Sequence, residues 1–196
     1  MVRVLAVNNY PTEERFEKLR SCLLLGGAEV EVADWRGCSA GVFDRYDGVA
    51  LSGSPDMLSE AAAREKYAAE TRAIAEARVP VLGVCFGHQM MSLAFGGDVV
   101  KDSRHVLDFV KTSFAGEEPL FEGLGASALL LESRHDVVPA VPPGFRLLAS
   151  SETTKVAAMR HRDRPLYGVQ SHPERYSKEN PGGRRLVQNF VTMLRR

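Results

Sequence analysis

The feature that most constrains the fold is an alternation, from the first residues on, of short apolar runs with segments of helical periodicity. The apolar runs are rich in β-branched residues and too short for helices, which favours buried strands. The sequence predicts strands at residues 2–7, 29–33, 47–52, 80–84 and 166–170. It predicts helices between Thr12 and Gly26, over 61–77, over 88–95, and from 181–183 onward. Such alternation forms right-handed βαβ units, so we expect a mostly parallel sheet with helices on both faces.

The second half of the chain has a different pattern. From about Asp98 to Arg162 the apolar runs lie closer together, with turn sequences PPG at 142–144 and RDRP at 162–165. This spacing predicts hairpins, and therefore a small mixed or antiparallel extension of the sheet. Since 196 residues suit one domain and no repeat or linker is visible, we expect a single domain over residues 1–196.

Composition narrows the functional class. Lys and Arg together number 25, as do Asp and Glu, so the net charge is zero and predicts no general attraction to nucleic acid or to a membrane surface. The apolar runs are far shorter than the roughly 20 residues that span a bilayer. Three cysteines without paired spacing argue against a disulfide framework, and none has partners at metal-ligand spacing. We expect a cytoplasmic protein without a bound metal.

Cys85 is the strongest candidate for chemistry. It follows a predicted strand and lies between Gly83 and Gly87, in the G-x-nucleophile-x-G form of a nucleophile elbow. Such a turn leaves the side chain strained and exposed, and the dipole of the next helix favours the thiolate. The N–H of Phe86 is then a candidate donor to an oxyanion. The alternative is that Cys85 is only a small buried residue in a tight turn.

His172 is the candidate base. It lies at the carboxyl end of a predicted strand, and in a parallel sheet that is the edge at which Cys85 also lies. Glu174, two residues on, is placed to accept the second imidazole N–H and to hold the ring as the third member of a triad. Pro173 between them restricts the backbone. Alone, a histidine beside a proline is usually a loop residue.

Two motifs carry a resemblance to a known family. The sequence PVLGVCFGHQ at 80–89 and the sequence YGVQSHPE at 167–174 resemble the two signatures of class I (triad) glutamine amidotransferases, in the same order and spacing. The likeness covers nearly the whole chain. A weaker likeness, at LES 131–133 with Asp136, PPGF 142–145 and SSET 150–153, is to the stand-alone glutaminase subunits of GMP synthases.

The resemblance implies a flavodoxin-like sheet and a two-step hydrolysis of glutamine. Cys85 would attack the carboxamide carbon, His172 would move the protons, and ammonia would pass to an ATP-using synthetase partner. No cofactor or nucleotide is expected in this chain. The remaining substrate contacts that the resemblance implies involve the backbone N–H groups of Ser54 and Phe86, and residues Gly53, Gln89, Asp108 and Phe109.

Three positions depart from the family pattern. The loop after the third strand reads SGSP, with Ser54 where the family has a second glycine. A positive φ at Ser54 would cost roughly 1 kcal/mol more than at glycine, so we expect the oxyanion hole to form only after a partner or substrate rearranges this loop. Asp108 stands where a small residue is usual, and is either a partner for the substrate ammonium or a solvated strand residue. Arg134 is the third departure, because it separates Ser133 from His135 where the family has Ser-His. Arg134 and His135 are expected to be surface charges.

Two other functions remain open at this point. A γ-glutamyl hydrolase or peptidase would keep the triad without a partner, and the departures at Ser54 and Asp108 leave room for it. A non-catalytic relative on the same scaffold is the other alternative, against which the presence of Cys85, His172 and Glu174 argues.

Overall fold

A nine-stranded mixed sheet forms the centre of the computed structural model, which describes residues 1–195. The strand order is β2-β1-β3-β4-β9-β8-β7-β5-β6. Its strands are β1 (Val2–Asn8), β2 (Ala28–Asp34), β3 (Gly48–Leu51), β4 (Val81–Val84), β5 (Val100–Phe114), β6 (Ser127–Val137), β7 (Phe145–Ser151), β8 (Ala158–His161) and β9 (Leu166–Val169). From β2 to β9 all neighbours are parallel, and from β9 to β6 all are antiparallel. The predicted parallel core with an antiparallel extension is confirmed.

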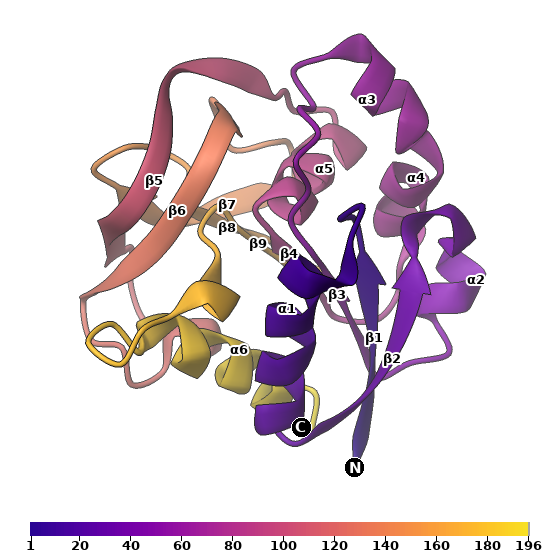
Figure 1. Cartoon of the computed structure of the whole chain (residues 1–196), viewed down its shortest axis with the longest axis horizontal. Helices are drawn as coiled ribbons and strands as arrows, with labels where there is room; N and C mark the ends of the chain where they lie inside the picture. Colours follow the sequence, from indigo (N-terminus) through magenta and orange to yellow (C-terminus); the bar gives the residue numbers. More distant parts are fainter. Residues whose placement is uncertain (196) are drawn as a thin grey trace.

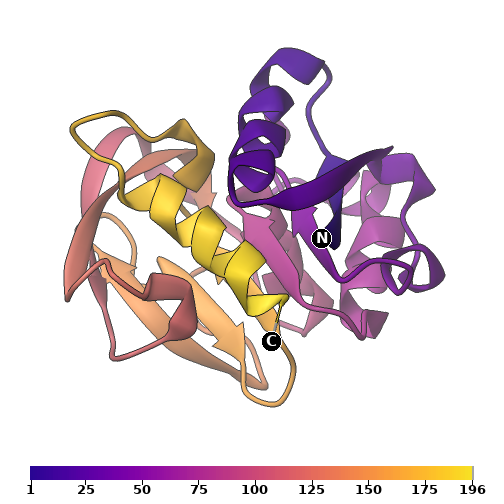
Figure 2. The same ribbon diagram turned by 90° about the horizontal axis from the view of Figure 1, so that it is seen from below.

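Helices cover both faces of the parallel strands (Figures 1 and 2). They are α1 (Glu13–Leu25), α2 (Ala40–Phe43), α3 (Ala61–Lys66), α4 (Ala68–Glu76), α5 (Phe86–Ala94) and α6 (Gly182–Met193), with short 3-10 turns η1 (Trp35–Gly37), η2 (Pro119–Phe121) and η3 (Pro173–Arg175). Val4 packs in the core with α1 and α6, whereas its neighbour Leu5 packs in the core with α4 and α5. Because strand side chains alternate between faces, each buried strand contributes to two separate cores.

The segment predicted as one helix over 61–77 is two helices that meet at Tyr67. The backbone of Tyr67 leaves the helical region, with φ −100° and ψ 14°. Its ring is 1% exposed and lies 4.7 Å, between ring centroids, from both Trp35 and Phe86. Burial of this large ring outweighs the good helix propensity of the segment, which is why propensity alone missed the break.

A further difference concerns the residue at which the helix after Cys85 begins. The helix after Cys85 begins at Phe86 rather than near residue 88, so Cys85 itself is its N-cap residue. Within residues 1–195 no helix is both long enough and apolar enough to cross a membrane.

Candidate active site

Cys85 occupies a strained turn between β4 and α5. Its φ of 47° and ψ of −94° make it the one non-glycine residue with positive φ among residues 1–195. The backbone N–H of Cys85 donates to the carbonyl of Val169 at 2.8 Å, which ties the turn to the end of β9. A non-glycine residue in this conformation costs of order 1–3 kcal/mol and persists only where the surroundings impose it. The elbow predicted from the two flanking glycines is therefore present.

The glycines of the elbow are required by space and not by their own φ angles. A Cβ at Gly83 would lie 2.6 Å from the backbone carbonyl carbon of Gly87, and one at Gly87 would lie 2.7 Å from Cβ of Leu51. Real Cβ atoms essentially never approach so closely. The strand, the turn and the helix therefore come together only because both positions lack a side chain.

Cys85 and His172 line the same pocket, of about 500 Å³, at the carboxyl edge of the parallel strands. Ser54 and Gln89, both expected near substrate, line it as well. Cys85 is 5% exposed, so its thiol is less open to solvent than the expected exposed position. A largely buried nucleophile that faces a pocket is shielded from solvent but open to a ligand of matching shape.

His172 is held by Glu174 as the sequence predicts. The distance between Nδ1 of His172 and Oε1 of Glu174 is 2.8 Å, and both side chains are at most 5% exposed. The backbone N–H of His172 donates to the carbonyl of Leu131 at 2.7 Å, which fixes the loop against β6. Burial by itself lowers the pKa of His172, but the negative charges of Cys85 and Glu174 outweigh it and raise that pKa to about 10. The geometry favours the imidazolium form of His172.

The loop after β3 approaches this pair closely. A Cβ at Gly53 would lie 2.5 Å from the hydroxyl of Tyr10 and 2.7 Å from Cε1 of His172, so a glycine is needed there. Ser54 has no positive φ, and its hydroxyl accepts the backbone N–H of Asp56 at 3.2 Å. The strain considered for Ser54 is therefore absent from this conformation of the loop. Tyr10 was not singled out from the sequence, since nothing in its neighbourhood forms a motif.

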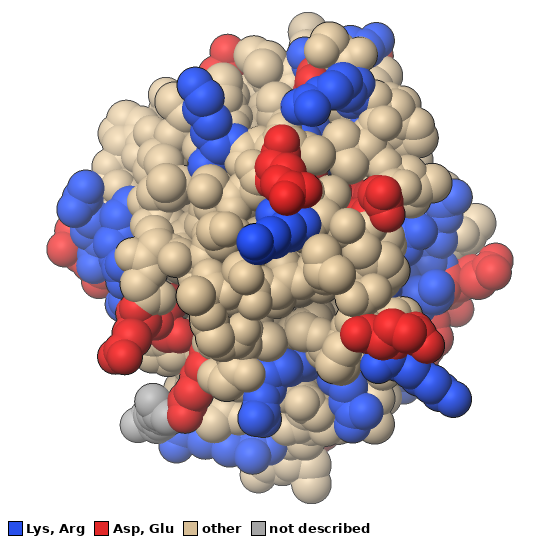
Figure 3. Space-filling view, turned by 90° about the vertical axis from the view of Figure 1, so that its left-hand side faces the viewer, with Lys and Arg blue, Asp and Glu red and all other residues tan. Residues whose placement is uncertain are grey.

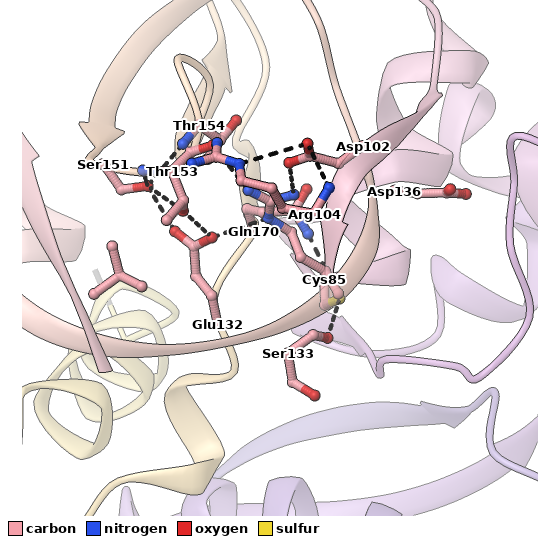
Figure 4. Close-up of polar contacts among 12 residues, drawn as sticks. Cys85, Asp102, Arg104, Glu132, Ser133, Asp136, Ser151, Thr153, Thr154 and Gln170 are labelled. Atoms are coloured by element: carbon pink, nitrogen blue, oxygen red, sulfur yellow. Dashed lines mark hydrogen bonds and ion pairs between the residues drawn. The ribbon is translucent and has the colours of Figure 1, made fainter. Parts of the chain in front are cut away.

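Two glutamines from different elements lie near Cys85: Gln170 contacts its thiol, and Gln89, on α5, lines the same pocket. Nε2 of Gln89 donates to the carbonyl of Asp136 at 3.0 Å, and Nε2 of Gln170 lies 3.5 Å from Sγ of Cys85. Sγ of Cys85 in turn lies 3.8 Å from the carbonyl oxygen of Ser133, on β6 (Figure 4). Gln170 stands inside the second motif, but only the pairing of β4 with β9 shows that it faces the sulfur.

The structure does not bring Asp108 and Phe109 to the pocket. Asp108 is exposed, and its carboxylate accepts the backbone N–H of Phe109 at 2.7 Å. Leu107, the preceding residue of β5, lines the pocket instead. Since side chains alternate along a strand, a shift of one position places Asp108 on the opposite face from Leu107. The interpretation of Asp108 as a solvated strand residue fits this position.

Arg134 is a correction, because it was expected to be a surface charge and is 4% exposed. Its guanidinium pairs with Glu132 at 2.9 Å and with Asp102 at 2.8 Å, and it donates to the carbonyl of Thr153 at 2.9 Å. Glu132 also accepts the hydroxyl of Thr153 at 2.6 Å. These contacts join β6 to the start of β5 and to the turn after β7. His135, by contrast, is exposed as expected.

Charges of both signs are mixed on the face shown in Figure 3, which agrees with the zero net charge. The two other cysteines are buried, Cys22 in one core and Cys38 in the other. Among residues 1–195 no group of three or more potential ligands could hold a metal ion. Cys85 is therefore the one thiol that lines the pocket with His172.

Comparison with known proteins gives consistent matches. The family model for glutamine amidotransferase class-I matches residues 12–194. A glutamine-hydrolyzing GMP synthase subunit of Archaeoglobus fulgidus is 37% identical over 150 residues, which cover 76% of this chain and 77% of that protein. The corresponding GMP synthase subunit of Thermococcus kodakarensis is 38% identical over 149 residues, 74% of each chain.

Solved structures show the same architecture. A candidate GMP synthase subunit from Thermoplasma acidophilum has a TM-score of 0.87 and 28% identity, and the match covers 100% of this chain and 94% of that one. A glutamine amidotransferase from Thermotoga maritima has a TM-score of 0.71 and 20% identity, over 88% of this chain and 76% of that one, which shows a shared fold. Fold, motifs and family match agree, and the chain belongs to the class-I glutamine amidotransferases.

Proposed function

We propose that this chain is the glutaminase subunit of a GMP synthase, which hydrolyses glutamine and passes the ammonia to a separate ATP-using synthetase subunit. The observation that carries the proposal is the juxtaposition of Cys85, on its strained turn, with His172, which Glu174 holds at 2.8 Å. The two GMP synthase relatives named above support the choice of synthase. In this proposal residues 1–196 act as one amidotransferase domain in the cytoplasm, where free cysteines stay reduced.

The first step is attack by the thiolate of Cys85 on the carboxamide carbon of glutamine. A new S–C bond forms and the carbonyl oxygen becomes an oxyanion, which the backbone N–H groups of Phe86 and Ser54 would stabilise. The imidazolium of His172 then gives its proton to the departing nitrogen. The C–N bond breaks, ammonia leaves, and a γ-glutamyl thioester remains on Cys85.

The second step is hydrolysis of the thioester. Neutral His172 takes a proton from a water molecule as that water attacks the thioester carbon. The S–C bond breaks, and glutamate leaves together with its new oxygen. Glu174 keeps the imidazole in one orientation and stabilises its charged form in both steps. Thiolate and imidazolium are restored, so the cycle is balanced.

Glutamine itself would lie with its side chain between Cys85 and Gln89, both of which line the pocket. Gly53 and Ser54 would border it on the β3 side. Because Ser54 here has no positive φ, the proposed oxyanion hole is completed when substrate or the synthetase moves this loop. Activity that depends on the partner would then follow from the loop rather than from the triad.

The proposal is tested by ammonia release from glutamine, with and without the ATP-using synthetase subunit. Wild-type protein, Cys85→Ala and Cys38→Ala are compared, because Cys38 is a buried thiol outside the pocket and controls for loss of a cysteine as such. We expect release by the wild type and by Cys38→Ala, and a loss of more than about 10³-fold in Cys85→Ala.

Two results would contradict the proposal in different ways. No release under any condition would rule out a glutaminase. A different result would identify a stand-alone γ-glutamyl hydrolase with the same triad. In that case ammonia release is strong, the synthetase neither increases the release nor uses the ammonia, and other γ-glutamyl compounds are cleaved equally well.

A further inference from the structure

Glu70, on α4, is a carboxyl group buried completely beside the loop that follows β3. Its side chain is 0% exposed. Oε1 of Glu70 accepts a hydrogen bond from Nδ2 of Asn9, at 3.2 Å, although the two residues are 61 positions apart. Asn9 follows directly after β1 and is 2% exposed. A buried carboxylate is costly unless it is paired with a cation, and no ion pair involves Glu70 among residues 1–195.

Each of the two side chains has one oxygen left over. Oε2 of Glu70 and Oδ1 of Asn9 are both buried and have no hydrogen-bond partner among the described residues. Two leftover acceptors on groups that already share one hydrogen bond are unfavourable as long as both can only accept. A proton on Oε2 changes this, because a carboxylic acid donates. With its O–H turned to Oδ1 of Asn9, the acid would close the pair into a ring of two hydrogen bonds.

Asn9 connects this pair to the loop at the catalytic edge. Its backbone N–H donates to Oγ of Ser52 at 2.9 Å, and its Nδ2 also donates to the carbonyl of Ser52 at 3.4 Å. Oγ of Ser52 donates in turn to the carbonyl of Gly53 at 2.9 Å. Gly53 lies against His172, and Ser54 lines the pocket. A continuous set of hydrogen bonds thus runs from α4 to the proposed oxyanion loop.

We propose that Glu70 is a positioning residue that works as a neutral acid, in a cyclic acid–amide pair with Asn9. It holds Ser52 and Gly53 in place, so that the movement that completes the oxyanion hole for the reaction at Cys85 is confined to Ser54. The inference rests on the proposed glutaminase function and adds a residue outside the pocket to it. Ionisation of Glu70 breaks one of the two hydrogen bonds of the pair. It also sets a negative charge beside the amide oxygen of Asn9, which loosens the loop.

The groups around Glu70 favour the neutral form. Burial is the main cause that raises the pKa of Glu70, which is about 8. The hydrogen bond from Asn9 acts in the opposite direction and lowers it. The charge of Asp34, at the end of β2, raises it further. Asp34 is itself paired with Arg36 at 2.9 Å, in an exposed salt bridge. The buried thiol of Cys38 also feels the charge of Glu70. Burial is the main cause that raises the pKa of Cys38 and the charge of Glu70 is the next, so this thiol stays neutral.

The pH profile of glutaminase activity, measured with the synthetase present, tests this role in three proteins. Glu70→Gln keeps the ring of two hydrogen bonds, since an amide donates and accepts as the neutral acid does, but it cannot ionise. Glu70→Leu removes both hydrogen bonds at similar volume. We expect kcat of the wild type to fall by about tenfold through a step near pH 8. Glu70→Gln should match the wild type at pH 7 and lack that step, and Glu70→Leu should be about tenfold slower throughout.

A second readout does not depend on activity. Infrared spectra at pH 7 should show the C=O stretch of a buried protonated carboxyl in the wild type and not in Glu70→Gln. Any of three results overturns the inference. They are a step near pH 8 that persists in Glu70→Gln, an infrared band that this substitution leaves unchanged, and full kcat in Glu70→Leu. If no protein releases ammonia at any pH, the proposed function fails, and the infrared comparison still decides whether the acid–amide pair exists.

Discussion

Replacing Glu174 with glutamine separates the charge of the triad carboxylate from its geometry. In the structure Oε1 of Glu174 lies 2.8 Å from Nδ1 of His172, with both side chains buried. A glutamine has the same length and can still accept the Nδ1–H through its own oxygen. What the substitution removes is the negative charge that favours an imidazolium in a site away from water.

The expected magnitude follows from the difference between two kinds of hydrogen bond. A bond to a charged group contributes about 1.5–3 kcal/mol, and a neutral bond about 0.5–1.5 kcal/mol. The difference of about 1–1.5 kcal/mol corresponds to roughly a five- to tenfold fall in kcat, since each 1.36 kcal/mol is one factor of ten. Glu174→Ala, which removes the bond altogether, should be slower again by a similar factor.

The pH dependence gives a second, signed expectation. The charges of Cys85 and Glu174 raise the pKa of His172 above its ordinary value of 6.5, to about 10, despite the opposing effect of burial. Activity that needs the imidazolium is therefore present below this pKa and is lost as the pH rises through it. With one of the two charges gone, the imidazolium loses its proton at a lower pH. The final alkaline fall in kcat/KM should therefore move to lower pH in Glu174→Gln.

The assay is ammonia release over a range of pH, with Glu179→Gln as the control, because Glu179 is an exposed carboxylate five residues further along the chain. The wild type and all of these variants carry Glu70, so any step near pH 8 is common to them. A kcat within twofold of the wild type at pH 7, together with an unshifted alkaline fall, would refute the assignment of Glu174 as the orienting member of the triad.

Three other substitutions test packing, the buried ion pairs and the loop. Gly87→Ala should lower the free energy of unfolding, measured in urea, by about 1–3 kcal/mol, since the added Cβ would overlap a neighbour. Gly41→Ala is the control, because its Cβ would meet nothing within 4 Å, and equal stability of the two variants would contradict the steric argument. Arg134→Met should cost about 3–5 kcal/mol because it leaves the buried carboxylate of Glu132 without a cation, whereas loss of the exposed pair in Arg20→Met should cost less than about 1 kcal/mol. A loss of similar size in both would show that burial of Arg134 is unimportant. Ser54→Gly should raise kcat of the isolated chain by about fivefold, because glycine adopts positive φ about 1 kcal/mol more readily than serine. If the isolated wild type is already fully active and Ser54→Gly leaves its kcat unchanged, loop rearrangement is excluded.

Most of the parallel half of the fold could be predicted because its signals are local. The β-branched runs, the helical periodicity and the glycines around Cys85 each lie within about ten residues. The rule that parallel strands end at one edge then placed His172 beside Cys85, although 87 positions separate them in the numbering. The observed pairing of β4 with β9 supplies the contact that this rule anticipated.

The positions that prediction missed depend on contacts distant in sequence. The helix break at Tyr67 comes from burial of its ring against Trp35 and Phe86, which propensity does not register. Burial of Arg134 requires carboxylates that come from β6 and from the start of β5. The orientation of Asp108 depends on strand register, which shifts between Lys101 and Val106 where β5 pairs with β6.

The sequence by itself determined the class of chain and its central chemistry, because local periodicity and a strained Gly-x-Cys-x-Gly turn have few structural solutions. Tertiary structure alone decided which charged side chains are buried and what they touch. Glu70 shows why: its place in α4 predicts an ordinary helix residue, and only the packing of α4 against the end of β1 removes it from water beside Asn9. Desolvation is a property of the whole fold, and so are the protonation states that follow from it.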